Sequence, residues 1–211
     1  MEFNEILKRR YSCRSYNNKK VKDDDLNLIL NNAILAPNAG NLQAWRFIVV
    51  KDDVKREQIA TACLQQKWMF QAPIHIIIAA DVEYVKKNYG DKDQMYCIQD
   101  CTLAASNIIL TATSLNLDTC FVSAFDKDML KRALNIPENI IPYIVITLGY
   151  SDNNPEEKKR YNLSNMVFFD NYGSKMNDKS IFPLEKQKQV IQKQQRNLFN
   201  KIREKLIKHT K

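Results

Sequence analysis

The stretch "QMYCIQDCTLAASNIILTATSLN", residues 94–116, is the longest helical pattern in the chain and decides its fold. Small or apolar side chains recur at helical spacing along one stripe, formed by Met95, Ile98, Thr102, Ala105, Ile109, Ala112 and Leu115. Most of the other positions are also small or apolar. A helix that is apolar on nearly all sides belongs in the centre of a domain or at a subunit interface. The rest of the chain is therefore expected to pack around this helix.

Shorter patterns on both sides of the long helix predict strands that alternate with helices. The expected strands cover residues 46–51, 74–80, 119–123 and 143–150. Helices are expected near residue 3, from Asp23, over 52–64 and over 126–134. Few of the strands alternate polar and apolar residues, which is typical of a sheet that is covered on both faces.

Charge separates the C-terminal end from the rest of the chain. Of the net charge of +8, residues 176–211 carry +7, with ten Lys or Arg against three Asp or Glu. We expect a folded domain over residues 1–175 and a basic amphipathic arm over 176–211 that wraps a second subunit. Nucleic-acid binding through the arm is the alternative. The arm has only Phe182 and Phe199 as aromatic residues and so offers no stacking platform, and we predict no nucleic-acid partner.

Several common catalytic arrangements are absent from the sequence. The four glycines lie far apart, which excludes a dinucleotide-binding turn and a P-loop. Of the two histidines, His75 lies in an apolar strand and is interpreted as a core residue, and His209 lies in the arm, so Ser–His and Cys–His catalysis have no centre. The five scattered cysteines, with Cys97 and Cys101 read as packing residues, predict neither disulfides nor a metal site. Any redox chemistry would need a bound cofactor.

The segment "RRYSCRSY", residues 9–16, concentrates arginines near the start of the chain. In an extended backbone Arg10, Ser12 and Arg14 project from one side. Two guanidinium groups and a hydroxyl suit a phosphate monoester, because arginine donates forked, charge-assisted hydrogen bonds. A solvated basic helix end is the alternative.

The segment "APNAGNLQAWRFIVV", residues 36–50, places an irregular loop between a helix and a strand. The amides of Asn38, Asn41 and Gln43 can each donate and accept hydrogen bonds. Such a loop could recognise the edge of a flat heteroaromatic ring, on which donors and acceptors alternate. An ordinary turn is the alternative.

Together with "QAPIHIIIAAD" (71–81), "LNLDTCFVSAF" (115–125) and "IPYIVITLGY" (141–150), these segments resemble the nitroreductase family of FMN-dependent oxidoreductases. The resemblance extends from about Phe3 to Gly173 and keeps a late element in which basic residues end at Arg160 before "LSNMVFFDNYG". Each motif is weak alone, but their order and spacing are specific. The resemblance implies an α+β fold with a mixed sheet covered by helices, and a homodimer with the long helix at its interface.

The resemblance also assigns residues to two FMN sites that both subunits share. One subunit would supply Arg10, Tyr11, Ser12, Arg14, Val122, Ser123, Ala124 and Arg160. The loop of the other subunit would supply Pro37, Asn38, Ala39 and Asn41. In this assignment Arg10, Ser12 and Arg160 bind the FMN phosphate. Arg14 reaches the pyrimidine edge of the ring, and residues 122–124 pass near its far side.

The implied activity is ping-pong hydride transfer. NAD(P)H would reduce the flavin at N5, and a nitro compound, quinone or similar small acceptor would then be reduced in the same place. Arg14 would stabilise the negative charge of the reduced ring. No side chain need act as a nucleophile, so we predict no catalytic residue outside the cofactor. Dehalogenation and flavin breakdown are the alternatives within the same fold, and a non-catalytic carrier of flavin or another small ligand is a further alternative.

The sequence departs from the family pattern at several positions. Asn38 stands where Ser is common, and Ala44 stands where Pro is common. Residues 115–125 lack the usual glycines, so Ser123 or Ala124 would narrow the pocket over the flavin and affect the range of acceptors. The chain has no apolar run near the roughly 20 residues that span a bilayer, and its N-terminus has no apolar signal core. We therefore expect a cytoplasmic protein without a membrane partner.

Overall fold

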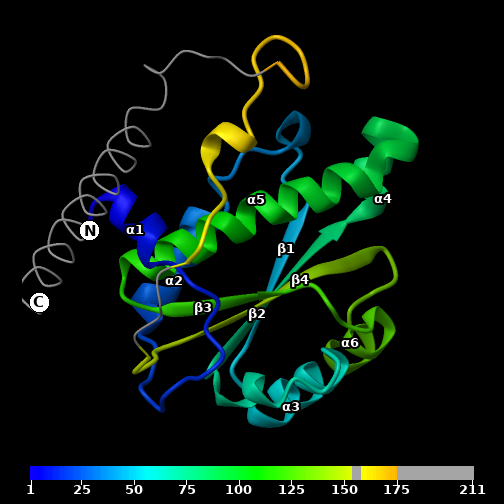
Figure 1. The fold of residues 1–211 in the computed structure, drawn as a ribbon. Helices are drawn as coiled ribbons and strands as arrows, with labels where there is room; N and C mark the ends of the chain where they lie inside the picture. The colour runs from blue at the N-terminus through cyan, green and yellow to red at the C-terminus, as the bar shows by residue number, and fades with distance from the viewer. Residues whose placement is uncertain (154–157, 175–211) are drawn as a thin grey trace, which may run out of the picture. The chain divides into compact units, whose positions relative to one another are not determined.

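The computed structural model describes residues 1–153 and 158–174 (Figure 1). The chain divides into two units, Met1–Pro155 and Glu156–Lys211. The basic arm predicted over residues 176–211 lies outside the described residues. No helix in the described parts of the chain has both the length and the apolarity that crossing a membrane requires.

A four-stranded sheet forms the centre of the first unit. Its strands are β1 (Trp45–Val50), β2 (Ile74–Asp81), β3 (Asp118–Val122) and β4 (Ile140–Gly149), in the spatial order β1-β2-β4-β3. Neighbouring strands in this order are antiparallel; Val50 at the end of β1, for example, pairs with His75 near the start of β2. In the described residues, parallel pairing occurs only at an isolated bridge between Ser12 and Thr119. The predicted mixed sheet is thus antiparallel among its four strands and mixed only through this bridge.

Six α-helices accompany the sheet in the described residues. They are α1 (Phe3–Arg9), α2 (Asp23–Ala33), α3 (Asp53–Ala62), α4 (Val82–Tyr89), α5 (Asp93–Ser114) and α6 (Lys127–Leu134). Five of them match helices expected from the sequence. The exception is α4, a short helix with one buried residue, Val85, and an N-terminus capped by Asp81, whose carboxylate accepts the Tyr84 N–H.

Two apolar cores lie on opposite faces of the sheet. Side chains of β2 alternate between them, so that Ile76 and Ile78 pack with α2 and α5, while Ile77 packs with α3 and α6. Figure 1 shows α2 and α5 over one face and α3 and α6 over the other. The prediction of a sheet covered on both faces is confirmed, as is the α+β class with a long central helix.

The long helix α5 buries one face and exposes another. Its buried side chains include Cys97, Cys101, Ala104, Ala105, Ile108 and Ala112. The stripe expected from the sequence begins exposed, at Met95 and Ile98, and turns toward the core further along, where Ala105 and Ala112 are buried, because a seven-residue apolar repeat drifts around a helix of 3.6 residues per turn. Further apolar side chains are exposed on α5 and on α2 and its C-terminal turn, namely Leu103, Leu28, Ile34 and Leu35.

His75 is a core residue, as expected. Its side chain is fully buried, and Nε2 lies 3.0 Å from the carbonyl oxygen of Met69, to which it donates as a neutral ring. Burial lowers the pKa of His75 to about 4. The ring therefore stays uncharged at neutral pH, and its complete burial supports the interpretation as a core residue.

Candidate functional site

The Arg10–Arg14 segment leaves α1 in an extended conformation and runs beside β3. Arg10 has φ −54° and ψ 126°, and the Cys13 N–H donates to the Thr119 carbonyl at 2.9 Å. Cys13 is buried in a small cluster with Tyr16 and Ala72, whereas Ser12 and Arg14 are exposed. The alternation expected from the sequence is therefore present, because anchoring Cys13 inward turns its two neighbours outward.

Positive charge gathers around this segment. Burial raises the pKa of the Cys120 thiol on β3, and the nearby Arg14, the Ser12 side chain and Arg10 act in the opposite direction. The Arg14 guanidinium lies over the Trp68 ring, 5.9 Å from its centroid. The structure thus brings Arg10, Ser12 and Arg14 together at one edge of the sheet.

Tyr11 lies within the same segment and carries an unsatisfied hydroxyl. The oxygen is buried, lies near Cys13 and Ser151, and makes no well-formed hydrogen bond within the described residues. Burial raises the pKa of Tyr11. A buried hydroxyl without a partner is costly, so this group is a candidate for contact with a ligand.

Residues 122–124 follow the same edge of the sheet. Val122 is the buried last residue of β3, and the next two residues, Ser123 and Ala124, are exposed. Since Ser12 and Thr119 pair in parallel, β3 continues in the direction of the Arg10–Arg14 segment. Both predicted groups therefore belong to one region of the molecule.

The second predicted group lies in the loop after α2, which we call the amide loop (residues 36–44). Its backbone adopts the left-handed region at Gly40 (φ 55°), Asn41 (φ 56°) and Gln43 (φ 51°). A Cβ at Gly40 would approach the Tyr89 hydroxyl oxygen to 2.4 Å. A side chain at this position would strain the backbone and would have to displace the Tyr89 ring at the end of α4, which favours glycine.

Hydrogen bonds within the amide loop occupy some of the predicted groups. The Asn38 side-chain oxygen accepts the Gln43 N–H at 2.9 Å, and Gln43 Nε2 donates to the Asn41 side-chain oxygen at 3.2 Å. The Ala39 N–H donates to both carboxylate oxygens of Asp100 on α5, at 3.1 and 3.3 Å. Pro37 is exposed beside them. The Asn38 side-chain oxygen thus closes the loop, while the Asn41 side-chain nitrogen makes no hydrogen bond within the described residues.

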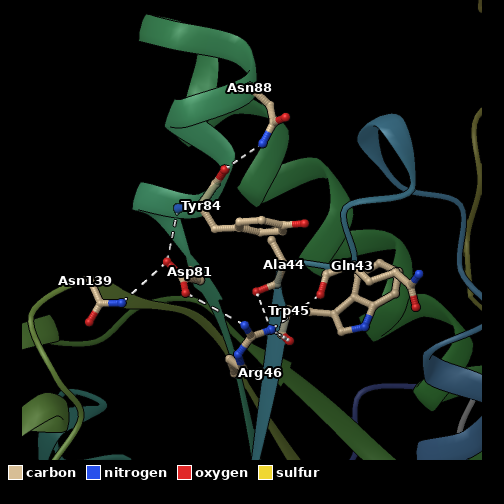
Figure 2. A network of polar contacts seen from close by, with 8 residues as sticks. All are labelled: Gln43, Ala44, Trp45, Arg46, Asp81, Tyr84, Asn88 and Asn139. Carbon is tan, nitrogen blue, oxygen red and sulfur yellow. Dashed lines mark hydrogen bonds and ion pairs between the residues drawn. The ribbon is translucent and has the colours of Figure 1, made fainter.

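Charged residues that the sequence interpretation did not single out hold the other end of the amide loop (Figure 2). Arg46 Nη1 donates to the Trp45 carbonyl at 2.9 Å and lies 3.3 and 3.4 Å from the Ala44 and Gln43 carbonyl oxygens. Arg46 Nη2 forms an ion pair with Asp81 at 3.8 Å. Asp100 was also missed, although a carboxylate in the middle of an otherwise apolar helix was a visible signal.

Within the first unit, no hydrogen bond in the described residues joins the amide loop to the Arg10–Arg14 segment. Arg160 belongs to the second unit, where its Nη1 donates to the Lys159 carbonyl at 3.0 Å. No group of three His, Cys, Asp or Glu side chains in the described parts of the chain could hold a metal ion. The candidate site is therefore built from cations, hydroxyls and amides.

Comparison with known proteins identifies the family. Residues 7–68 and 62–150 match the sequence profile of the nitroreductase family. The chain belongs to the nitroreductase family. A relative from Archaeoglobus fulgidus, provisionally named NADH dehydrogenase/NAD(P)H nitroreductase, is 33% identical over 156 residues, which cover 72% of this chain and 84% of the relative.

Solved structures agree with this membership of the nitroreductase family. A nitroreductase family protein from Clostridium difficile is 30% identical, with a TM-score of 0.73 over 81% of this chain and 99% of that protein. The NADPH:FMN oxidoreductase of Vibrio harveyi, solved with NAD+, shares the fold at 21% identity, with a TM-score of 0.74 over 89% of this chain and 85% of that one. This chain is accordingly an NAD(P)H oxidoreductase of the nitroreductase type.

Proposed function

We propose that the protein is an FMN-dependent oxidoreductase that uses NAD(P)H to reduce nitro compounds, quinones or similar small acceptors by a ping-pong mechanism. The observation that carries this proposal is the grouping of Arg10, Ser12 and Arg14 beside β3. Neither guanidinium group forms an ion pair or a hydrogen bond within the described residues. Both can therefore bind an anionic ligand without first breaking an ion pair or a hydrogen bond with the protein.

The donor set beside β3 fits a flavin mononucleotide. Guanidinium groups bind phosphate with forked, charge-assisted hydrogen bonds, and the unpaired Tyr11 hydroxyl adds a group that needs a partner. In this proposal Arg10 and Ser12 hold the phosphate.

Bound FMN would supply a ring that takes a hydride from NAD(P)H and passes it to the acceptor. Arg14 would place positive charge at the pyrimidine edge, where negative charge develops on reduction. Val122, Ser123 and Ala124 would flank the ring, and the side chains of the last two would limit the room for an acceptor. The protein would thus bind, orient and polarise, while no side chain acts as a nucleophile.

We also propose a homodimer in which the amide loop serves the flavin of the other subunit. Two observations support this arrangement. The amide loop and the Arg10–Arg14 segment are not hydrogen-bonded to each other within one chain, and apolar side chains remain exposed on α5 and α2, among them Ile98 and Leu28. Pro37, Asn38, Ala39 and Asn41 would then reach the flavin across the interface.

The test is the affinity for FMN. We expect the purified protein to be yellow and to bleach when NADH or NADPH is added without oxygen. Replacing Arg10 with Ala should weaken FMN binding by about tenfold to a hundredfold, because a charge-assisted hydrogen bond is lost. Arg132→Ala, which removes an exposed arginine from α6, is the matched control and should bind FMN as the wild type does.

A colourless protein that takes up no added FMN would overturn the proposal. So would an Arg10→Ala variant with unchanged affinity. Consumption of the flavin itself under oxygen, with no oxidation of NAD(P)H by quinone or nitrofuran, would instead favour flavin breakdown.

A further inference from the structure

The carboxylate of Asp100 is buried in an unusual environment. Asp100 is 4% exposed and lies on α5, facing the amide loop. Both oxygens accept the same donor, the Ala39 N–H, and no Lys or Arg among the described residues forms an ion pair with it. Burying a carboxylate is costly unless the group is hydrogen-bonded or paired. The hydrogen bond from the Ala39 N–H therefore links α5 to the amide loop.

The amide loop is a segment that needs such support. Asn41 and Gln43 occupy the left-handed region, which costs free energy for residues other than glycine. Such a conformation persists only where the surroundings impose it. At Gly40 a side chain would have to displace the Tyr89 ring, whose hydroxyl lies 2.4 Å from the position of a Cβ.

The loop is held at both ends. Asp100 holds Ala39 at the start, and Arg46, paired with Asp81, contacts the carbonyl groups of residues 43–45 at the end (Figure 2). The Asp81 N–H also donates to the Ala44 carbonyl at 3.0 Å. Asn41 lies between these two attachments, so its amide is displayed from a loop whose ends cannot shift independently of α5 and the sheet.

We propose that Asp100 is a positioning residue: by holding the Ala39 N–H from α5, it presets the amide loop, and with it the Asn41 amide, for the flavin bound by the other subunit. The inference rests on the proposed function. It adds that the central helix of one subunit determines the flavin affinity of the site completed by its partner. Asp100 itself does not touch the flavin in this scheme.

The experiment compares FMN dissociation constants by visible titration. Asp100→Ala should weaken FMN binding about tenfold or more, because the Ala39 N–H loses a charged acceptor. Asp100→Asn should lose less, since its amide oxygen can still accept this hydrogen bond. Asp93→Asn, at the start of the same helix, is the matched control and should bind FMN within about twofold of the wild type, because among the described residues Asp93 accepts a hydrogen bond only from its neighbour Gln94 and none from the amide loop.

Mixing variant subunits separates positioning from general stability. In a dimer of one Arg10→Ala subunit and one Asp100→Ala subunit, one site has both defects and the other has neither. We expect the mixed dimer to regain one site of wild-type affinity, whereas each variant homodimer has none. A purely structural role of Asp100 would instead lower the thermal midpoint and leave FMN affinity unchanged.

The possible failures are distinguishable. If Arg10→Ala binds FMN like the wild type, the proposed function fails. If Arg10→Ala weakens binding but Asp100→Asn and Asp100→Ala do not, or if the mixed dimer gains no strong site, only the role of Asp100 is overturned. Should Asp100→Ala not fold, Asp100→Asn replaces it in both measurements, with weaker binding than the Asp93→Asn control as the expected result and equal binding as the refutation.

Discussion

His75 shows how strongly one residue depends on its position in the core. Its ring is fully buried on β2 and donates to the Met69 carbonyl, and the nearby Arg56 is the charged group that faces it. Burial, with a smaller contribution from Arg56, lowers the pKa to about 4, although the hydrogen bond to Met69 opposes this change. The folded protein therefore holds this histidine neutral at a pH where the unfolded chain already takes up a proton.

This difference predicts a pH-dependent stability. Below pH 6.5, the ordinary pKa of histidine, the unfolded state binds a proton that the folded state accepts only near pH 4. The contribution of His75 is therefore complete above pH 6.5 and is lost as the pH falls. Lowering the pH from 7 to 5 should therefore reduce the free energy of unfolding by about 2 kcal/mol through His75. Urea denaturation of the wild type and of His75→Gln would measure this, and equal pH slopes in both would contradict it.

At the scale of elements, the start of α6 follows from its sequence, because an N-cap residue precedes the helix. Asp126 accepts the Met129 N–H at 2.8 Å through its side chain, as an N-cap residue does. Its backbone N–H donates to the Ala62 carbonyl at the end of α3, at 2.9 Å. The expected helix over 126–134 is confirmed, and its cap also ties α6 to its neighbour.

Removing this cap should weaken the apolar core between the sheet and the helices α3 and α6. Asp126→Ala is expected to lower the free energy of unfolding by about 1 kcal/mol, since an orphan N–H at the helix start loses its acceptor. Asp126→Asn keeps a capping oxygen, so its free energy of unfolding should stay within a few tenths of a kcal/mol of the wild-type value. Urea denaturation at neutral pH would check both variants. A loss of equal size in the two would show that the charge matters and the cap does not.

At the scale of the whole molecule, the proposed site needs two copies of the chain. Exposed apolar side chains on α5 and α2 offer a surface for this contact, and Ile98 is 48% exposed on α5. Val54, 63% exposed on α3, lies on the helix layer across the sheet. Apolar residues on the two layers can therefore be compared directly.

Introducing a charge on the exposed apolar surface of α5 should both separate the subunits and release the flavin. We expect Ile98→Glu to shift the protein from dimer to monomer in sedimentation and to lose most of its bound FMN, because a carboxylate would be buried at the contact without a partner. Val54→Glu should stay dimeric and yellow. A dimer that keeps its flavin after Ile98→Glu would exclude this face as the interface, and a monomeric wild type that binds FMN would exclude the shared site.

Parts of the candidate site were predictable because they depend on local chemistry. In the Arg10–Arg14 segment, the polar residues Ser12 and Arg14 are exposed on either side of the buried Cys13, as the sequence pattern predicts. The Asn, Gly and Pro residues of the amide loop are typical of an irregular loop. The supporting residues were not predictable in this way. Arg46 and Asp81 are 35 positions apart and meet only because β1 and β2 pair. The short helix α4 was missed because a single buried residue leaves no apolar period to detect.

By itself, the sequence determined where the main strands and helices lie, that both faces of the sheet are covered, and that the chain resembles nitroreductases. These features follow from periodicity and from motifs, which are local properties of the chain. Only the tertiary structure decided which face of α5 is buried, that Asn38 closes its own loop, and that Asp100 holds Ala39. These are contacts between distant residues, and their geometry is set when the sheet forms and its helices pack on it.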